Sequence, residues 1–350
     1  MSTIAIVLPL YGRSDFTLRF LDFYNRKKCN FSFYIPDGSK KKIFNQKILE
    51  KKFKNLKIIY KSYPYDKNMY MYVKKLSSIS EIINEKYLML IANDDFFNFK
   101  FIAESKKFLD KNSEFVSVAG FVKNIRVILP FKSINDHGHV IIQKSFQYQS
   151  YGQIFNDVNS DDKNERIKNY LMSLTYESLI RTSVFKKIFS LAKEFKVKNS
   201  FEMNWFMNFI VLTSGKKKHI KLISQIRQSN TYRGLGQDDM LYGKGATKSR
   251  FLKFLKMLER KKILTSKNSR SLKNMDNDLL NIWDEERKKL TIKKKLIIQY
   301  VFWRDLIKNM NYIFYFFWLL FTKDKYHRLF KKINSIFKYY NSKNNNFKTF

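Results

Sequence analysis

Four short apolar runs near the start of the sequence constrain the fold of this 350-residue chain more than any other feature. β-Branched and aromatic residues fill these runs, and turn-forming residues follow them, as is typical of strands buried on both faces of a sheet. The runs lie at 4–8 (IAIVL), 31–35 (FSFYI), 56–60 (LKIIY) and 87–92 (YLMLIA).

Amphipathic helical patterns separate these runs, at 14–25, 41–54 and 70–83. Strands that alternate with helices are typical of an α/β fold, in which helices flank a mostly parallel sheet. We therefore predict such a fold for the first part of the chain.

The composition is strongly basic, with 68 Lys and Arg against 30 Asp and Glu and a formal net charge of +38. A functional basic surface would favour polyanionic partners, whereas codon bias in an AT-rich genome would enrich lysine at solvated positions without a function.

Cys29 is the only cysteine, which excludes an intramolecular disulfide and fits a reducing cytoplasm. The apolar run at 313–321 is too short to span a bilayer, so we predict no transmembrane helix.

Acidic and amide side chains follow two of the predicted strands. Asp37 lies in the turn PDGS, and Asn93, Asp94 and Asp95 come directly after the fourth apolar run. Ligands of open α/β sheets bind beyond the carboxyl ends of the strands, and a carboxylate pair buried there is costly unless a cation neutralises it. The pair therefore indicates a Mg²⁺ or Mn²⁺ site shared with substrate phosphates, although Asx residues that merely cap a turn would give the same pattern.

The motifs PLYGR, DGS and NDD, in this order, resemble those of GT-A glycosyltransferases, in particular the bacterial family-two-like enzymes. The stretches 176–189 (YESLIRTSVFKKIF) and 201–230 resemble a subgroup of bacterial surface-polysaccharide glycosyltransferases. This resemblance covers roughly residues 3–235. It implies a Rossmann-like GT-A catalytic domain at 1–240.

The resemblance also implies roles for individual residues. Asp95 would hold a divalent metal, Mn²⁺ or Mg²⁺, and Glu202 would act as the catalytic base of an inverting transfer. Asn93 departs from the family pattern, because many relatives have Asp at this position. The nucleotide-sugar would contact Pro9, Tyr11, Arg13, Asp37, Asn93, Asp94, Arg181 and Arg227.

Each of these assignments has a simpler alternative. Glu202 could only stabilise the start of the apolar helix predicted at 203–212, because an acid in the first turn interacts favourably with the helix dipole. Arg227 could be an ordinary surface residue, Arg181 could pair with a neighbouring acid, and Arg13 could be a turn residue. The glycine-rich stretch 231–248 is either a lid over the site or a linker.

The sequence changes character after Arg250. Helical patterns with apolar and basic faces continue without strands, so we predict a helical, basic and aromatic region at 241–341 and a disordered tail at 342–350. Such helices are typical of a peripheral anchor on an anionic membrane, while a bundle packed on the catalytic domain is the alternative.

The function predicted from these observations is transfer of a sugar from a nucleotide-diphosphate sugar to a glycan or lipid-linked acceptor. We expect this reaction in the cytoplasm, at the inner face of the membrane, during capsule or lipopolysaccharide synthesis. A nucleotidyltransferase would need a more glycine-rich first loop than PLYGR. An RNA-binding protein would leave the acids at the strand ends unexplained, so we expect no nucleic-acid partner.

Overall fold

The computed structural model describes residues 3–128, 139–146, 157–168, 178–228, 248–270, 272 and 327–342. Its chain forms two compact units. The first comprises 1–129, 134–245 and 326–350, and the second comprises 130–133 and 246–325. In the second unit, the described residues form helix α9 (Lys248–Arg260), a turn and a short helical segment at 266–270.

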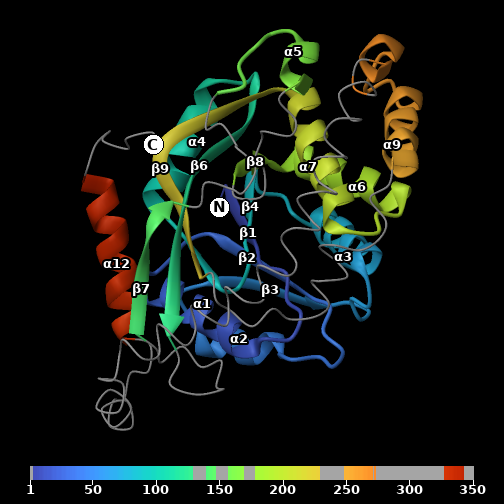
Figure 1. The fold of residues 1–350 in the computed structure, drawn as a ribbon. Helices are drawn as coiled ribbons and strands as arrows, with labels where there is room; N and C mark the ends of the chain where they lie inside the picture. Colours follow the sequence, from blue (N-terminus) through green and yellow to red (C-terminus); the bar gives the residue numbers. More distant parts are fainter. Residues whose placement is uncertain are drawn as a thin grey trace, which may run out of the picture. The chain divides into compact units, whose positions relative to one another are not determined.

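A single mixed sheet organises the first unit (Figure 1). Its order is β3-β2-β1-β4-β8-β6-β9-β5, and β7 pairs with β6 off this path. The strands are β1 (Ile4–Val7), β2 (Ser32–Asp37), β3 (Lys57–Ser62), β4 (Tyr87–Leu90), β5 (Asp95–Phe97), β6 (Phe115–Ile128), β7 (His139–Phe146), β8 (Leu179–Arg181) and β9 (Lys216–Gln228).

The four predicted strands form a continuous parallel part of the sheet, β3-β2-β1-β4. Beyond β4 the direction changes, because the short strand β8 pairs antiparallel with both β4 and β6. β9 runs parallel to β6, and β5 pairs antiparallel with β9. The predicted α/β fold with flanking helices is thus confirmed, and the sheet extends well beyond its predicted strands.

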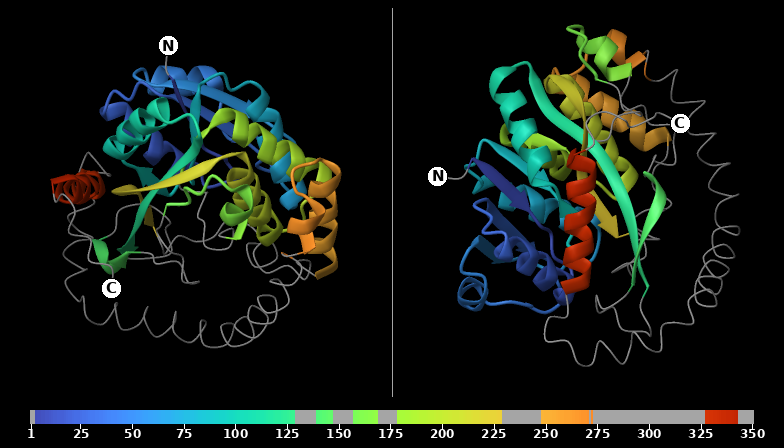
Figure 2. Two further views of the ribbon diagram at one scale, coloured as in Figure 1. Left: turned by 90° about the horizontal axis from the view of Figure 1, so that it is seen from above. Right: turned by 90° about the vertical axis from the view of Figure 1, so that its left-hand side faces the viewer.

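Helices cover both faces of this sheet (Figure 2). One group packs against the sheet in a common apolar core, and in the other group α6 packs on both α3 and α7. The first group is α1 (Ser14–Arg26), α2 (Gln46–Lys52), α4 (Phe99–Lys111) and α12 (His327–Ser342). The second is α3 (Met69–Glu81), α6 (Thr182–Phe195) and α7 (Ser200–Ser214), and a short helix α5 (Lys163–Lys168) contacts α7.

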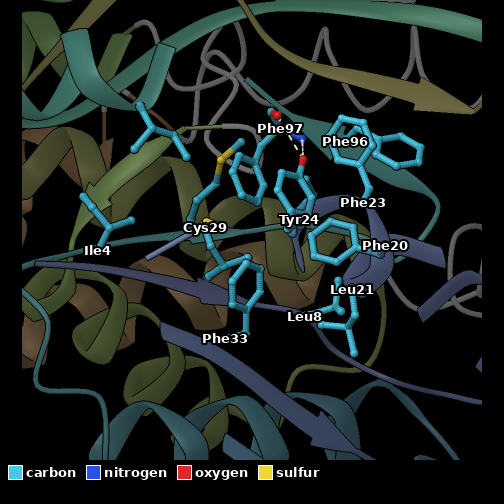
Figure 3. Packing of buried hydrophobic residues seen from close by; sticks show 14 of the residues in the cluster. Ile4, Leu8, Phe20, Leu21, Phe23, Tyr24, Cys29, Phe33, Phe96 and Phe97 are labelled. Atoms are coloured by element: carbon cyan, nitrogen blue, oxygen red, sulfur yellow. Dashed lines mark hydrogen bonds between the residues drawn. The ribbon is translucent and has the colours of Figure 1, made fainter. Parts of the chain in front are cut away.

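An aromatic cluster joins α1 to β5 (Figure 3). The rings of Tyr24 and Phe97 stack at a centroid distance of 3.9 Å. The Tyr24 hydroxyl also accepts a hydrogen bond from the Phe97 amide (2.6 Å) and donates one to the Phe97 carbonyl (2.9 Å). These bonds fix β5 against a buried helix. They also fix the acidic turn, which comprises Asn93, Asp94 and Asp95 and leads into β5.

Helix α12 belongs to the first unit and packs along β9 and β7 (Figure 1). Its apolar side chains Phe330, Ile333, Ile336 and Phe337 are all buried in the core. We predicted this segment as part of the helical region at 241–341, with packing on the catalytic domain as the alternative to a membrane anchor. The structure shows such packing for α12, because its apolar face covers the sheet near β5. The predicted boundary at 240 lies close to the second unit's start at 246. The tail at 343–350 lies outside the described residues, as do 229–247, which hold nearly all of the predicted lid or linker.

No helix in the described part of the chain is long and apolar enough to cross a membrane.

Candidate functional site

The candidate site lies where the parallel strands β2, β1 and β4 end. The chain passes from β1 to β2 on one side and returns to β4 on the other, so this is the switch point at which open α/β sheets bind ligands. The loop after β1 stays close to β2, because Leu10 pairs with Asp37 in a parallel bridge. The amides of Leu8 and Leu10 donate to β2 carbonyls, so the missing N–H of the intervening Pro9 costs no hydrogen bond in this ladder.

Asp37 is buried and organises the turn that follows β2. Its Oδ1 accepts a hydrogen bond from the Ser39 amide (2.8 Å), and its Oδ2 accepts bonds from the Tyr60 hydroxyl (2.5 Å) and the Ile43 amide (3.3 Å). Burial, together with the bond to Asp37, raises the pKa of Tyr60 to about 12. The structure therefore places Asp37 at the predicted edge, where its carboxylate holds the loop in shape.

The loop after β1 carries Tyr11 and Arg13 to the same edge. The hydroxyls of Tyr11 and Tyr65 form a hydrogen bond of 2.7 Å, and burial raises the pKa of Tyr11. Gly12 and Arg13 both have left-handed backbone angles, with φ of 59° and 55°. Such angles are strained for residues other than glycine, so the surrounding contacts must hold Arg13 in place.

Arg13 connects this loop to the acidic turn. Its Nη2 lies 2.8 Å from Asp94 Oδ2 in an ion pair whose side chains are 17% and 11% exposed. Asn93 Nδ2 donates to Thr17 Oγ1 (3.0 Å) and to the carbonyl of Arg13 (3.3 Å). Asn93 therefore binds the first turn of α1.

Asp95 starts β5 directly opposite Arg227 of β9. Asp95 Oδ2 accepts hydrogen bonds from Gln225 Nε2 (3.2 Å) and Arg227 Nε (3.4 Å). The structure thus brings together two residues that were assigned different partners, a metal for Asp95 and the nucleotide-sugar for Arg227. The sequence could not show this contact, because it depends on an antiparallel pairing between segments 132 residues apart.

Arg19 is a site residue that the sequence reasoning missed. It is fully buried, and its guanidinium lies over the rings of Phe16 (4.6 Å) and Phe96 (5.1 Å). Its Nη1 donates to Gln228 Oε1 (2.8 Å) and its Nη2 to the carbonyl of Asp94 (3.2 Å). The sequence did hold a signal for this residue, because Arg19 lies among the apolar residues of α1. A charged side chain at such a position needs buried hydrogen-bond acceptors.

A divalent metal fits this arrangement poorly. One or two carboxylates are enough for Mg²⁺ or Mn²⁺ when substrate phosphates complete the coordination. Here, however, Asp94 pairs with Arg13 and Asp95 with Arg227, so a bound cation would lie beside guanidinium groups. Within the described ranges, no three His, Cys, Asp or Glu side chains are grouped so that they could hold a metal ion. The metal remains a prediction.

Arg181 lies away from the acidic turn. It pairs with Tyr87, the first residue of β4, whereas the acidic turn follows the last residue of that strand. Its guanidinium donates to the carbonyls of Phe115 (2.8 Å), Leu109 (2.7 Å) and Asn112 (3.0 Å). This geometry supports a structural role in closing the connection from α4 to β6, and it does not support nucleotide binding by Arg181.

Glu202 is fully buried at the third position of α7. Asn199 caps this helix by accepting a hydrogen bond from the Glu202 amide (3.0 Å), and Glu202 Oε2 accepts one from the Lys198 amide (2.8 Å). This reciprocal pattern is close to a capping box. The contacts show that Glu202 stabilises the start of α7, and its role as a base remains a prediction.

A third ion pair, Asp66 with Lys75, is almost fully buried under the same loops. Lys75 Nζ contacts Asp66 Oδ2 and also donates to the carbonyl of Leu10 (3.2 Å). Burial raises the pKa of Asp66 and lowers that of Lys75. A Cβ atom at Gly38 would lie 2.3 Å from the Asp66 carboxylate, so glycine is needed there to let the two loops approach.

No protein-family model and no curated protein sequence matches the chain. Among solved structures, the chain is similar to S. aureus TarS 1–349, with 11% identity over 74% of this chain and 64% of that chain, and a TM-score of 0.45. The complex of TarS 1–349 with UDP-GlcNAc matches at 10% identity over 74% and 65% of the two chains (TM-score 0.45). The complex with UDP matches at 12% identity over 78% and 75% (TM-score 0.44). The chain thus spans less than two thirds of the first TarS chain.

Proposed function

We propose that this chain is a GT-A glycosyltransferase that transfers a sugar from a nucleoside-diphosphate sugar to a glycan acceptor. One observation carries the proposal: the arginines Arg13, Arg19 and Arg227 converge on the acidic turn at the switch point of the sheet. Fixed guanidinium groups are well suited to bind and stabilise a diphosphate. The neighbouring turn at Asp37 would contact the nucleoside, as the sequence resemblance implies.

The reaction proposed is a single displacement at the anomeric carbon. The acceptor hydroxyl would lose its proton to Glu202 as its oxygen bonds to the anomeric carbon, while the bond from that carbon to the diphosphate oxygen breaks. The nucleoside diphosphate would leave with the bonding electrons, and the configuration would invert. In this proposal Glu202 serves both as the base and as a residue of the helix cap.

The acceptor proposed is a cell-surface glycan or its lipid-linked precursor, and contact with an anionic membrane would bring the enzyme to it. Helix α12 exposes Lys331, Lys332 and Lys338 on the side opposite its buried apolar residues. Exposed lysines attract anionic head groups. This proposal uses the basic face of α12 alone, because the apolar face is buried in the protein.

A donor panel tests the proposed activity. The chain would be incubated with UDP-, GDP-, CMP- and dTDP-sugars, and its thermal unfolding and the release of free nucleotide would be measured. One donor should raise the unfolding temperature, and Asp37→Asn should weaken that effect. The control Asp22→Asn removes a partly exposed acid of α1 whose partner is Arg26, and it should leave donor stabilisation unchanged. Salt-sensitive binding of RNA, without stabilisation by any donor, would instead favour a polyanion-binding protein.

A further inference from the structure

We propose that Arg13 and Arg227 take the place of a divalent cation in neutralising the donor diphosphate, and that Asp94 and Asp95 position these arginines instead of binding a metal. This inference rests on the proposed function, because it concerns the same donor site. Its consequence is donor binding that does not require metal.

The first argument is the pairing of the charges. Each carboxylate of the acidic turn faces an arginine from another segment, Asp94 facing Arg13 at 2.8 Å and Asp95 facing Arg227 at 3.4 Å. The cation expected from the sequence at a buried carboxylate pair is therefore supplied by the protein itself. A metal ion added between these groups would be repelled by both guanidinium groups.

The second argument is the local balance of charge. Arg19 also donates to the acidic turn, through the carbonyl of Asp94. The arginines Arg13, Arg19 and Arg227 thus exceed the two carboxylates of the turn by one positive charge. An environment with excess positive charge favours an incoming diphosphate over an incoming cation.

The third argument is rigidity. Arg13 has a left-handed backbone, and its guanidinium lies 4.4 Å from the centre of the Phe16 ring. Arg227 belongs to the β9 ladder and is held opposite Asp95 by the pairing of β5 with β9. Groups fixed before the ligand arrives can stabilise a developing charge without reorganising, as a bound metal does.

The fourth argument is the capacity of the guanidinium group. A guanidinium carries five N–H donors in a planar fork, so a bond to one carboxylate oxygen does not exhaust its ability to bind a phosphate. The side chain of Arg227 is also 28% exposed, which leaves part of it within reach of a ligand. Asp95 would therefore orient Arg227 through Nε while Arg227 binds the diphosphate.

Binding of UDP, GDP, CDP and dTDP, measured by titration calorimetry, tests this inference. Each nucleotide is titrated into the full chain in EDTA and then in Mn²⁺. We expect one of them to bind in EDTA with an affinity within about threefold of that in Mn²⁺. Arg13→Gln and Arg227→Gln should each weaken that binding by about 10- to 100-fold, because each removes a hydrogen bond to a charged group.

The variant Asp95→Asn distinguishes two possible roles of Asp95, namely orienting Arg227 and binding a metal. The asparagine side chain keeps an oxygen acceptor for Arg227 Nε but is a poor metal ligand, so binding in EDTA should stay within about threefold of the wild type. The control Arg26→Gln removes an exposed arginine of α1 and should not change the affinity. If Arg227→Gln fails to fold, Arg227→Lys replaces it, because lysine keeps the positive charge but lacks the planar set of guanidinium donors. We expect Arg227→Lys to lower the nucleotide affinity about tenfold.

The outcomes are distinguishable. Binding that appears only with Mn²⁺, and that Asp95→Asn abolishes, would overturn the inference and leave the proposed function intact. If none of the four nucleotides binds with or without metal, the proposed function fails and the inference fails with it.

Discussion

Replacing Phe330 by alanine should destabilise the catalytic unit, although this residue lies far along the chain from the site. Phe330 is 5% exposed, and its ring packs edge-on against Phe23 (5.1 Å) and Phe96 (6.4 Å). The guanidinium of Arg26 also lies over this ring at 5.3 Å. Removing a buried phenylalanine costs about 3–5 kcal/mol of unfolding free energy, through lost burial and the cavity that remains. Because Phe96 directly follows Asp95, we also expect weaker nucleotide binding.

Urea unfolding followed by circular dichroism measures this effect, with the transition of the sheet-containing unit fitted separately. The matched control is Tyr339→Ala, because Tyr339 belongs to the same helix and is 49% exposed. Its effect should stay within about 0.5 kcal/mol. The reasoning is wrong if Phe330→Ala changes the unfolding free energy as little as the control does, since α12 would then not stabilise the sheet.

Three further predictions concern single residues. Lys75→Met leaves the Asp66 carboxylate buried without a counter-charge and should cost about 3–5 kcal/mol of unfolding free energy, while Asp66→Asn in the same chain should recover most of it in the same urea assay. Burial lowers the pKa of His219 to about 4, so between pH 6.5 and pH 4 the unfolded chain binds a proton that the folded chain does not. Stability should therefore fall by up to about 3 kcal/mol as the pH drops through this window, and His219→Gln should flatten a urea series across it. Glu202→Gln should keep the bond to the Lys198 amide and the unfolding temperature, and it should slow sugar transfer by about 10²–10⁴ if Glu202 is the base; a stability loss with full activity would limit Glu202 to the helix cap.

The parallel core of the fold could be predicted because its signals are local. Each of the first three apolar runs became a strand within two residues of the predicted ends, as β1, β2 and β3. The shortest strands carried no such signal. β8 and β5 have only three residues each, too few for a periodic pattern, and they form because longer strands beside them offer hydrogen bonds. The position of α12 was also beyond reach, since an amphipathic helix shows that it has a buried face but not what covers it.

The position of the candidate site could be predicted from the sequence, but the basic partners of its acids could not. The acids at the strand ends lie at the carboxyl edge as expected, since burial and strand direction determine that position. The basic partner of each acid depends on tertiary contacts, which a single sequence does not show. The partners lie in segments as far apart as the loop after β1 and strand β9, and none of them neighbours its acid in the sequence.

This difference bears on how a pair of acids should be interpreted in a basic chain. The buried aspartates Asp66, Asp94 and Asp95 are paired with Lys75, Arg13 and Arg227, whereas Asp37 and Glu202 accept hydrogen bonds from amides or a hydroxyl. With 68 Lys and Arg against 30 Asp and Glu, a strand-end carboxylate meets a protein cation more readily than in a neutral protein. A metal is only one way of meeting the cost of burying such a carboxylate. The excess of basic residues that first suggested a polyanion partner therefore also weakens the inference of a metal from two adjacent acids.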